Sequence, residues 1–297
     1  MVALAKKVNI NNSLASLKQK VAMPYLLLLP GILWLIVFFL SPILTLVSTS
    51  TKEPGLGFGE FIQTYRWANY TDALVNLQEQ FIRSFVYALI ATAIALAIAY
   101  PLAYAIAFKS GKWKNVLLVL VVAPFFCSFL LRTIAWRQIL AQDGIVFKSL
   151  VTLHLISPDT RLTSSAFAVI TGLAYNFLPF MTLPLYASLE RIDPRTLEAS
   201  GDLYANGIVT FRKVTVPLSM PGVVAGTLLT FIPAAGDFVN AQILGNPSTT
   251  MIGNVINAQY LQTANYPLAA TLSFLLMLMI LALVLVYIRK SGTEELV

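Results

Sequence analysis

The chain has 297 residues, of which 58% are hydrophobic and only 11% are charged, and its formal net charge is +7. Ordinary soluble domains are about 45–50% apolar and about 25% charged, so this composition excludes a soluble domain and indicates a protein of the lipid bilayer. The length accommodates one membrane domain and leaves no room for a second, soluble domain.

Six apolar stretches are long enough to cross a bilayer, because a helix needs about 20 residues to span about 30 Å of hydrocarbon. In chain order, the predicted spans are residues 24–48, 83–108, 115–138, 163–190, 217–244 and 266–289. The apolar run of the first span is too long for a signal peptide, so we expect a retained anchor. The predicted fold is therefore an all-α polytopic membrane protein with six transmembrane helices.

Lysine and arginine are concentrated on one side of these spans. Most of the 20 basic residues lie in the two tails and in the connections after the second and fourth spans. Because cytoplasmic segments carry such an excess, we expect both termini to be cytoplasmic. Residues 1–23 and 290–297 are then cytoplasmic tails, and residues 24–289 form the membrane domain with a cytoplasmic loop at 191–217. The spread of basic residues over four segments argues against nucleic-acid binding.

No motif for catalysis, metal binding or ATP binding is visible. The chain has one histidine, His154, and one cysteine, Cys127, and it lacks HExxH, GxSxG and GxxxxGK[ST] patterns. We therefore expect neither an enzyme nor a bound metal or cofactor. The energy for any work must come from an ion gradient or from another chain.

The loop at 191–217 contains signals for two short helices joined by a bend. Asp193-Pro194 is a good helix start, because Asp accepts an N–H of the first turn and Pro suits the first helical position. Asn206-Gly207 indicates a break before a second helix. Such a segment can lie on the lipid headgroups, or it can be the binding surface for a separate soluble protein that drives the membrane domain.

The same loop resembles a known motif. Glu198-Ala199-Ser200, followed by Val214-Thr215-Val216-Pro217, resembles the EAA loop of ABC importer permeases, in which Glu-Ala-Ala is followed by Gly and then by aliphatic-x-Leu-Pro. Tyr204 stands where the family has its glycine. Since glycine there permits a tight bend, we expect Gly201 or Gly207 to supply it instead.

The resemblance extends along most of the chain and is strongest to the PotB/PotH-type permeases of spermidine/putrescine importers. The matching stretches are 69–84, 124–136, 178–186, 231–238 and 251–259. Permeases from importers of iron, thiamine and phosphonates are related to this branch. The resemblance therefore indicates the family more specifically than it indicates the substrate. A gradient-driven carrier is the other alternative, but the internal repeat typical of that class is absent.

This resemblance implies a type I ABC importer permease fold in a bacterial cytoplasmic (inner) membrane. It also implies four kinds of partner: a dimer of ABC ATPase subunits that hydrolyses the ATP, a second permease, an extracytoplasmic substrate-binding protein, and membrane lipids. The residues expected to couple the permease to the ATPase are Glu198, Ala199, Ser200, Gly201, Tyr204, Gly207 and Pro217. Glu198 either stabilises its own helix from near the first turn or forms an ion pair with the ATPase.

Two further groups of residues have open interpretations. Arg132, Trp136 and Arg137 end the third span, where they are either interfacial anchors or an outer gate or docking point for the binding protein. Asp237 follows an uncharged run beside Asn240; it either caps a broken helix or pairs with a basic residue, or it meets a cationic substrate. Tyr175 is a candidate for the same path, although aromatic residues in such spans are more often packing residues.

Overall fold

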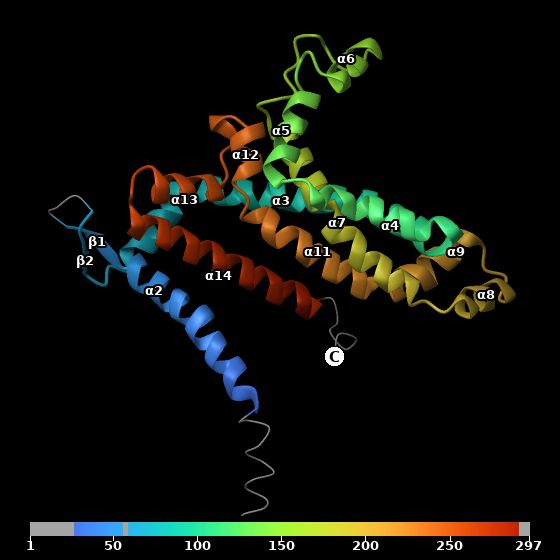
Figure 1. The fold of residues 1–297 in the computed structure, drawn as a ribbon, viewed down its shortest axis with the longest axis horizontal. Coiled ribbons are helices and arrows are strands. Elements are labelled where there is room, and N and C mark those ends of the chain that lie inside the picture. The colour runs from blue at the N-terminus through green and yellow to red at the C-terminus, as the bar shows by residue number, and fades with distance from the viewer. Residues whose placement is uncertain (1–26, 56–58, 291–297) are drawn as a thin grey trace, which may run out of the picture.

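The fold, seen in a computed structural model that describes residues 27–55 and 59–290, is almost entirely helical (Figure 1). The first helix covers Leu27–Ser50, and its last part is π-helical turn η1 (Ile36–Leu40) followed by α2 (Ser41–Ser50). A two-stranded antiparallel hairpin follows, with β1 (Lys52–Pro54) paired to β2 (Phe61–Gln63). The predicted tails lie outside the described residues, so they stay predictions.

Three long helices form the core of the bundle: α3 (Ala68–Phe108), α7 (Ala166–Glu190) and α11 (Met220–Ala235). The side of α3 that faces the other two is built from alanines three or four residues apart. The fully buried ones are Ala88, Ala91, Ala95, Ala99 and Ala103. Small side chains allow helix backbones to approach closely in a membrane, where dispersion contacts rather than water expulsion hold helices together.

Gly226 does the same for the contact between α11 and α7. A Cβ atom at Gly226 would lie 2.9 Å from the sulfur of Met181 and 3.0 Å from its carbonyl oxygen. Any larger residue would push the two helices apart, so this glycine is required by a close approach of backbones and not by an unusual φ angle.

The third predicted span, 115–138, is not one straight helix. Residues Gly111–Phe126 contain η2 (Gly111–Trp113), α4 (Lys114–Val122) and η3 (Ala123–Phe126), and they meet α5 (Phe129–Ile139) at 96°. Cys127 and Ser128 have extended backbones, with ψ near 140°. Pro124 has no N–H to continue the α-helical ladder, so the helix tightens and breaks here.

The fifth predicted span, 217–244, is also divided. Helix α11 ends at Ala235, and α12 (Val239–Leu244) is a separate short helix. The segment Gly207–Leu218 meets α11 at 62°. The break after Ala235 follows Pro233 and contains Gly236, both of which weaken a helix. The hydropathy pattern did not predict this break because the residues on both sides of the break are apolar.

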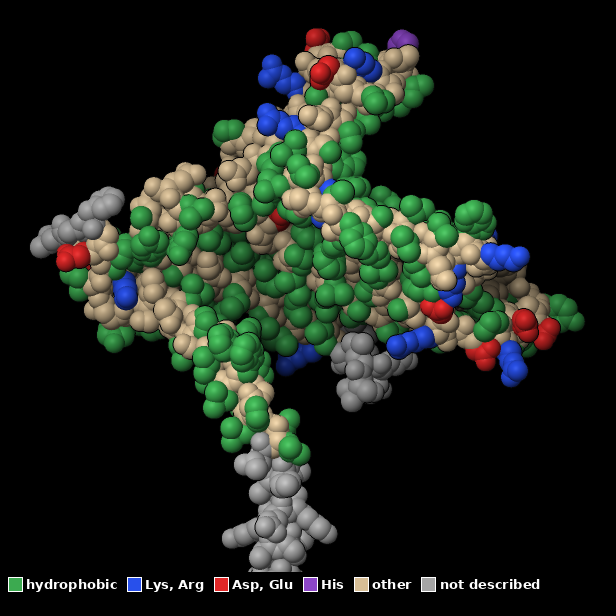
Figure 2. Space-filling model, viewed as in Figure 1, with side chains coloured by type: hydrophobic (Ala, Val, Ile, Leu, Met, Phe, Trp, Pro, Cys, Tyr) green, Lys and Arg blue, Asp and Glu red, His purple; other side chains and the backbone are tan. Residues whose placement is uncertain are grey.

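The described residues contain four helices that could each cross a membrane, and two bent pairs bring the number to six if each pair is one span. The second helix begins at Ala68, well before the predicted residue 83, with one non-helical residue at Leu77. Apolar side chains cover the middle of the molecule, while charged side chains gather at its ends (Figure 2). This distribution fits a bundle embedded in lipid.

Two groups of short helices extend from the bundle in Figure 1. From the middle of the bundle, α6 (Ile145–Thr152) follows α5 in a projecting arm, and α12 lies beside α5. η5 (Pro247–Thr249) and α13 (Ile252–Leu261) lead into the last span, α14 (Tyr266–Lys290). At the end opposite the β-hairpin, the predicted loop forms α8 (Pro194–Asp202), α9 (Gly207–Thr210), π-helical turn η4 (Phe211–Thr215) and α10 (Val216–Leu218).

Candidate functional site: the loop at 191–217 and a buried polar junction

The two short helices of the loop begin where the sequence predicts. The Asp193 side chain accepts a hydrogen bond from the Arg195 N–H at 2.9 Å, with Pro194 at the first helical position. The Asn206 side chain accepts one from the Val209 N–H at 2.9 Å and starts α9. These caps satisfy amide groups that have no partner within their own helix, so they set where each helix begins.

The bend between the helices is at Tyr204 itself. Its φ angle is +58°, in the left-handed region, whereas neither Gly201 nor Gly207 has a positive φ. The Ala205 N–H donates to the Ser200 carbonyl at 3.1 Å, and the Tyr204 N–H donates to the Gly201 carbonyl at 2.9 Å. This pair of bonds is the Schellman ending of a helix, which usually has glycine at the position of Tyr204. The expectation that Gly201 or Gly207 replaces the family glycine is therefore wrong.

Ser200 joins the two helices of the loop. Its side chain is buried, donates to the Leu197 carbonyl at 2.7 Å, and shares a 2.8 Å hydrogen bond with the Thr210 hydroxyl. An alanine, the usual residue of the motif at this position, could make neither bond. The substitution in the motif thus adds a connection between α8 and the end of α9.

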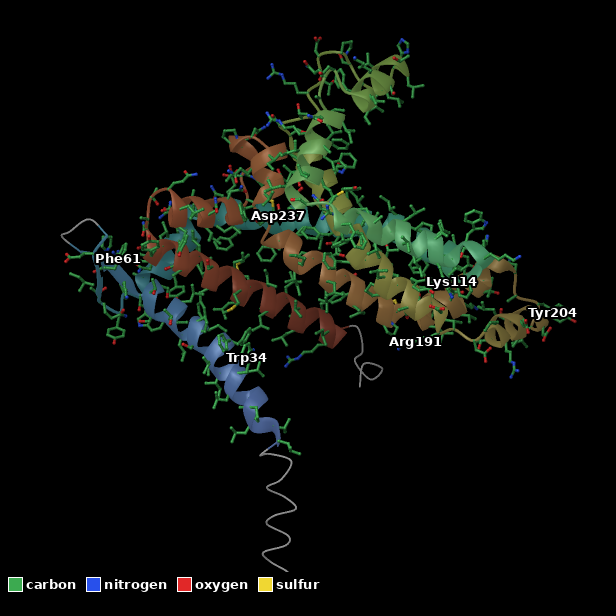
Figure 3. All side chains as sticks on the ribbon, in the orientation of Figure 1. Trp34, Phe61, Lys114, Arg191, Tyr204 and Asp237 are labelled. Carbon is green, nitrogen blue, oxygen red and sulfur yellow. The ribbon has the colours of Figure 1, made fainter. Side chains whose placement is uncertain are left out.

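The tip of the loop is unusually exposed for apolar residues. Leu203, Tyr204 and Ile208 are 80%, 99% and 73% exposed, and Figure 3 shows Tyr204 pointing away from the bundle. Glu198 and Ala199 are exposed nearby, as are Gly201, Gly207 and Pro217. Glu198 lies beyond the first turn of α8, so it does not stabilise the free amides at that end. Nothing in the described part of the chain covers these exposed residues of the loop.

The base of the loop is anchored on α3 by aromatic rings. The Phe211 ring packs edge-on against Tyr100, with centroids 5.6 Å apart, and against Tyr104, with centroids 5.9 Å apart. The Tyr100 hydroxyl also shares a 2.8 Å hydrogen bond with Ser219, at the start of α11. A displacement of the loop would therefore be transmitted to both α3 and α11. We refer to Phe211, Tyr100 and Tyr104 as the aromatic clasp.

A second cluster, the buried polar junction, joins α5, α7 and α12 inside the bundle. Asn176 Nδ2 donates to the Asn240 side-chain oxygen at 2.9 Å and to the Thr133 hydroxyl at 3.1 Å. All three side chains are at most 1% exposed. Of these residues, the sequence predicted Asn240 but missed Asn176 and Thr133. An amide within the uncharged stretch 162–189 was the available signal, because buried amides require partners.

Asp237 supports this junction from the break between α11 and α12 (Figure 3). Its side chain is buried and accepts a hydrogen bond from the Asn240 N–H at 2.8 Å, which caps α12. No basic residue pairs with it within residues 27–55 and 59–290. Of the structural alternatives, the observed role is the cap and not an ion pair.

Glycine at position 172 lets the junction close. A Cβ atom there would lie 2.9 Å from the Asn240 side-chain oxygen. Within the described residues, Asn176 Oδ1 and Asn240 Nδ2 have no hydrogen-bond partner. The junction therefore holds one spare acceptor and one spare donor in a low-dielectric setting, where polar interactions are strong.

The aromatic and basic candidates of the third span have separate environments. The Trp136 ring packs edge-on against Tyr175, with centroids 5.2 Å apart, so Tyr175 is at least partly a packing residue. Arg132 is only 9% exposed, and its guanidinium lies between the rings of Phe125 and Phe129, 5.2 and 5.7 Å from their centroids. Arg132 is thus not a snorkelling anchor, whereas Arg137 is exposed and can be one.

Comparison with known proteins decides the family. Residues 99–291 match the model of the "binding-protein-dependent transport system inner membrane component" family. The chain is 38% identical over 260 residues to the spermidine/putrescine transport system permease protein PotB of Haemophilus influenzae, covering 87% of this chain and 90% of the relative. It is 36% identical over 261 residues to PotB of Escherichia coli K12, covering 87% and 94%. The chain belongs to this family of ABC importer permeases.

Solved structures agree with this assignment at the level of the fold. A bacterial ABC transporter involved in the import of the polysaccharide alginate has a chain that matches with a TM-score of 0.68 at 20% identity, covering 95% of the permease and 99% of that chain. The MetNI methionine ABC transporter matches with a TM-score of 0.55 at 17% identity, covering 72% and 94%. The predicted type I importer permease fold and the resemblance to PotB-type permeases are confirmed, and the permease is a transport subunit of the inner membrane.

Proposed function

We propose that the permease forms one half of the translocation path of a polyamine importer and is driven by a separate ATPase dimer that binds the loop at 191–217. The observation that carries the proposal is the capped, rigid and exposed loop tip around Glu198 and Tyr204, fastened to two core helices. An apolar surface of this kind is stable when a partner covers it. A second permease supplies the other half of the path.

The substrate class follows from the relatives. Both PotB proteins with 36–38% identity carry names for spermidine/putrescine transport, and their similarity covers nearly the whole chain. In the permease, the carboxylate of Asp237 is the candidate contact for a polycation, beside Asn240 and Tyr175. A carboxylate in low dielectric attracts a cation more strongly than it does in bulk water.

The topology and the outer contacts complete the proposal. Both termini are cytoplasmic, the loop at 191–217 faces the ATPase, and residues 24–289 form the permease domain. On the opposite face, an extracytoplasmic binding protein docks near Arg137 and Trp136, where α5 leads into the projecting arm. Arg132, held between two phenylalanines, keeps the first turn of α5 in place for that contact.

The function is tested by reconstituting the permease with a co-expressed ATPase, second permease and binding protein in vesicles. We expect ATP-dependent uptake of labelled spermidine or putrescine. Glu198→Lys should insert normally but lower either ATPase association or the uptake per ATP by about ten-fold, since it reverses the charge at the expected contact. The control is Asp72→Lys near the start of α3, which reverses an exposed charge outside both the loop and the arm. Normal uptake by an assembled Glu198→Lys complex would show that Glu198 has no coupling role. Uptake of only iron, thiamine or a phosphonate would show that the substrate is not a polyamine.

A further inference from the structure

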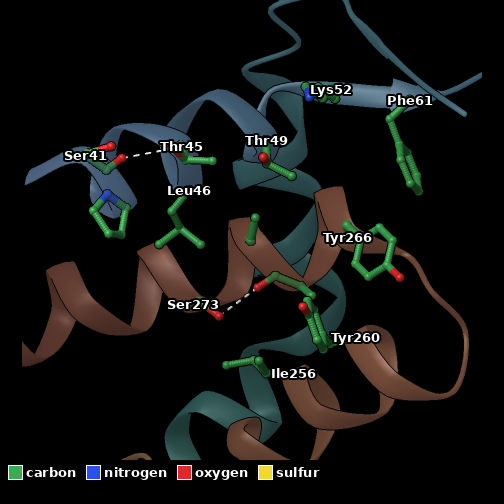
Figure 4. A pocket seen from close by; sticks show the side chains of 13 residues that line it. Ser41, Thr45, Leu46, Thr49, Lys52, Phe61, Ile256, Tyr260, Tyr266 and Ser273 are labelled. Atoms are coloured by element: carbon green, nitrogen blue, oxygen red, sulfur yellow. Dashed lines mark hydrogen bonds between the residues drawn. The ribbon is translucent and has the colours of Figure 1, made fainter. Parts of the chain in front are cut away.

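A cavity lies between the first and last spans, under the β-hairpin (Figure 4). Its volume is about 730 Å³, within the range of about 300–1,000 Å³ that is typical of small-molecule sites. One wall is the face of α2 that carries Leu46 and Thr49, and the opposite wall is formed by Ile256 of α13 and by α14. The residues that line the cavity are separate from those of the loop and of the polar junction.

The two ends of this cavity differ chemically. Near the hairpin, the lining includes Lys52, Thr49 and the tyrosines Tyr260 and Tyr266. Further along α2 and α14, the lining is apolar or small and includes Pro42, Leu46, Ala269 and Ala270. Figure 4 shows Lys52 and Phe61 at the hairpin end, with Leu46 and Ile256 on facing walls. The cavity therefore suits a molecule with a polar head and a hydrocarbon chain aligned with the spans.

The charge of Lys52 at the polar end of the cavity determines which charge the head group of a bound molecule can carry. Within residues 27–55 and 59–290, no acidic side chain forms an ion pair with Lys52. Its neighbour Glu53 pairs with Arg66 at 3.0 Å instead, because successive residues of a strand point to opposite faces. Among the described residues that line the cavity, none has a carboxylate. A polycation is excluded by this arrangement, whereas a phosphate would receive a charge-assisted hydrogen bond from the half-buried ammonium.

We propose that this groove binds an anionic phospholipid of the phosphatidylglycerol type, with its phosphate at Lys52 and one acyl chain between α2 and α14. The tyrosines beside Lys52 fit this placement, because tyrosine rings favour the level of the lipid headgroups. The hydroxyls of Thr45 and Ser273 donate to carbonyls of their own helices, so they do not oppose a hydrocarbon chain. The first span already meets α14 near its end, where the Thr271 hydroxyl donates to the Ser50 carbonyl at 3.0 Å, and a lipid in this position would extend that contact along α2.

The test measures lipid retained by the full chain, purified from membranes with its bound partners into detergent and examined by native mass spectrometry. Phosphatidylglycerol and phosphatidylcholine are supplied in equal amounts. We expect phosphatidylglycerol to be retained at least five-fold more than phosphatidylcholine. Lys52→Gln should remove this preference, and it leaves the hairpin intact because only the backbone of Lys52 pairs with Gln63. Lys148→Gln, an equal loss of charge at an exposed site on the arm, should retain the preference.

A second variant tests the acyl-chain end. Thr45 lies on the open side of the groove, so Thr45→Trp should fill the groove and lower retention of both lipids several-fold. Equal retention of the two lipids, or a preference unchanged by Lys52→Gln, would overturn the proposal. A disulfide cross-link from Thr45→Cys to the second permease, with no lipid retained, would show that a partner helix occupies the groove. Because the readout is bound lipid, failure here leaves the proposed transport function unaffected.

Discussion

At the scale of single residues, Tyr204 and Asp237 each hold a conformation that the surrounding chain requires. Tyr204 has the left-handed φ of +58° that ends α8, and Asp237 caps α12 from inside the bundle. The left-handed conformation costs a residue with a side chain about 1–2 kcal/mol. The tyrosine is retained at this cost while its ring is almost fully exposed, which is consistent with a surface that contacts a partner.

Tyr204→Gly tests the cost of that conformation. We expect the bend to become more stable by about 1 kcal/mol, because glycine adopts positive φ without strain. The amides of residues 204 and 205, which donate the two Schellman bonds, should then exchange with deuterium about five-fold more slowly. Tyr204→Val should accelerate exchange, since a β-branched residue disfavours this region. Faster exchange in Tyr204→Gly would show that the ring itself stabilises the loop.

Two substitutions at Asp237 separate its charge from its role as a cap. Asp237→Asn removes the charge but keeps an oxygen that can accept from the Asn240 N–H, so assembly should remain normal. If Asp237 contacts a polyamine, uptake by this variant falls several-fold. Asp237→Ala also removes the cap and should lower stability by about 1 kcal/mol, measured as the thermal midpoint of the assembled complex. Unchanged uptake kinetics in Asp237→Asn would eliminate the pathway role.

At the scale of helices, bends rather than straight spans create the two candidate sites. The 96° bend before α5 and the break before α12 allow both short segments to return to α7, where Thr133, Asn176 and Asn240 meet. The 62° bend before α11 similarly brings η4 against α3. In each case a proline at or near the bend lacks the N–H of a helical hydrogen bond, and tertiary contacts compensate for its loss.

The aromatic clasp should carry motion from the loop to the core. Phe211→Leu keeps an apolar side chain but loses two edge-on ring contacts, each contributing about 0.5–1.5 kcal/mol. We expect the ATPase to remain bound while the substrate imported per ATP hydrolysed falls several-fold. Phe231→Leu is the matched control, because it removes a ring pair between α11 and Phe85 that lies away from the loop. An equal loss in both variants would indicate general destabilisation and would contradict a specific role for the clasp.

At the scale of the whole molecule, the exposed loop lies at one end of the bundle and the β-hairpin at the other, while the arm projects from the middle (Figure 1). A pull on the loop can reach the arm through α3, α7 and α11, the three helices that share the core, because α7 also contacts α5. Rigid-body movement of such a bundle is a common way for transporters to alternate between two open states. The proposed topology places the loop and the arm on opposite sides of the membrane.

Cysteine labelling measures that orientation. In a Cys127→Ser background, since Cys127 is exposed, single cysteines at Ser110 and Asn206 should be shielded from an outside-only thiol reagent. A cysteine at Ser157, beyond α6 on the arm, should react. The expected pattern follows from the excess of basic residues around the first two positions. Outside labelling at Asn206 would invert the proposed topology.

The sequence by itself determined the membrane class, the family, the number of apolar stretches and the caps of the loop. These properties depend on composition, on uncharged runs, and on local signals such as Asp193-Pro194 and Asn206-Gly207, which act between residues close in the chain. The bend at Tyr204, the division of two spans and the meeting of Asn176 with Asn240 were decided by tertiary structure. The free energies of these three features depend on contacts between segments that are distant in the chain. Such contacts compensate for a strained φ angle or a lost helical hydrogen bond, and the hydropathy pattern along the chain does not report them.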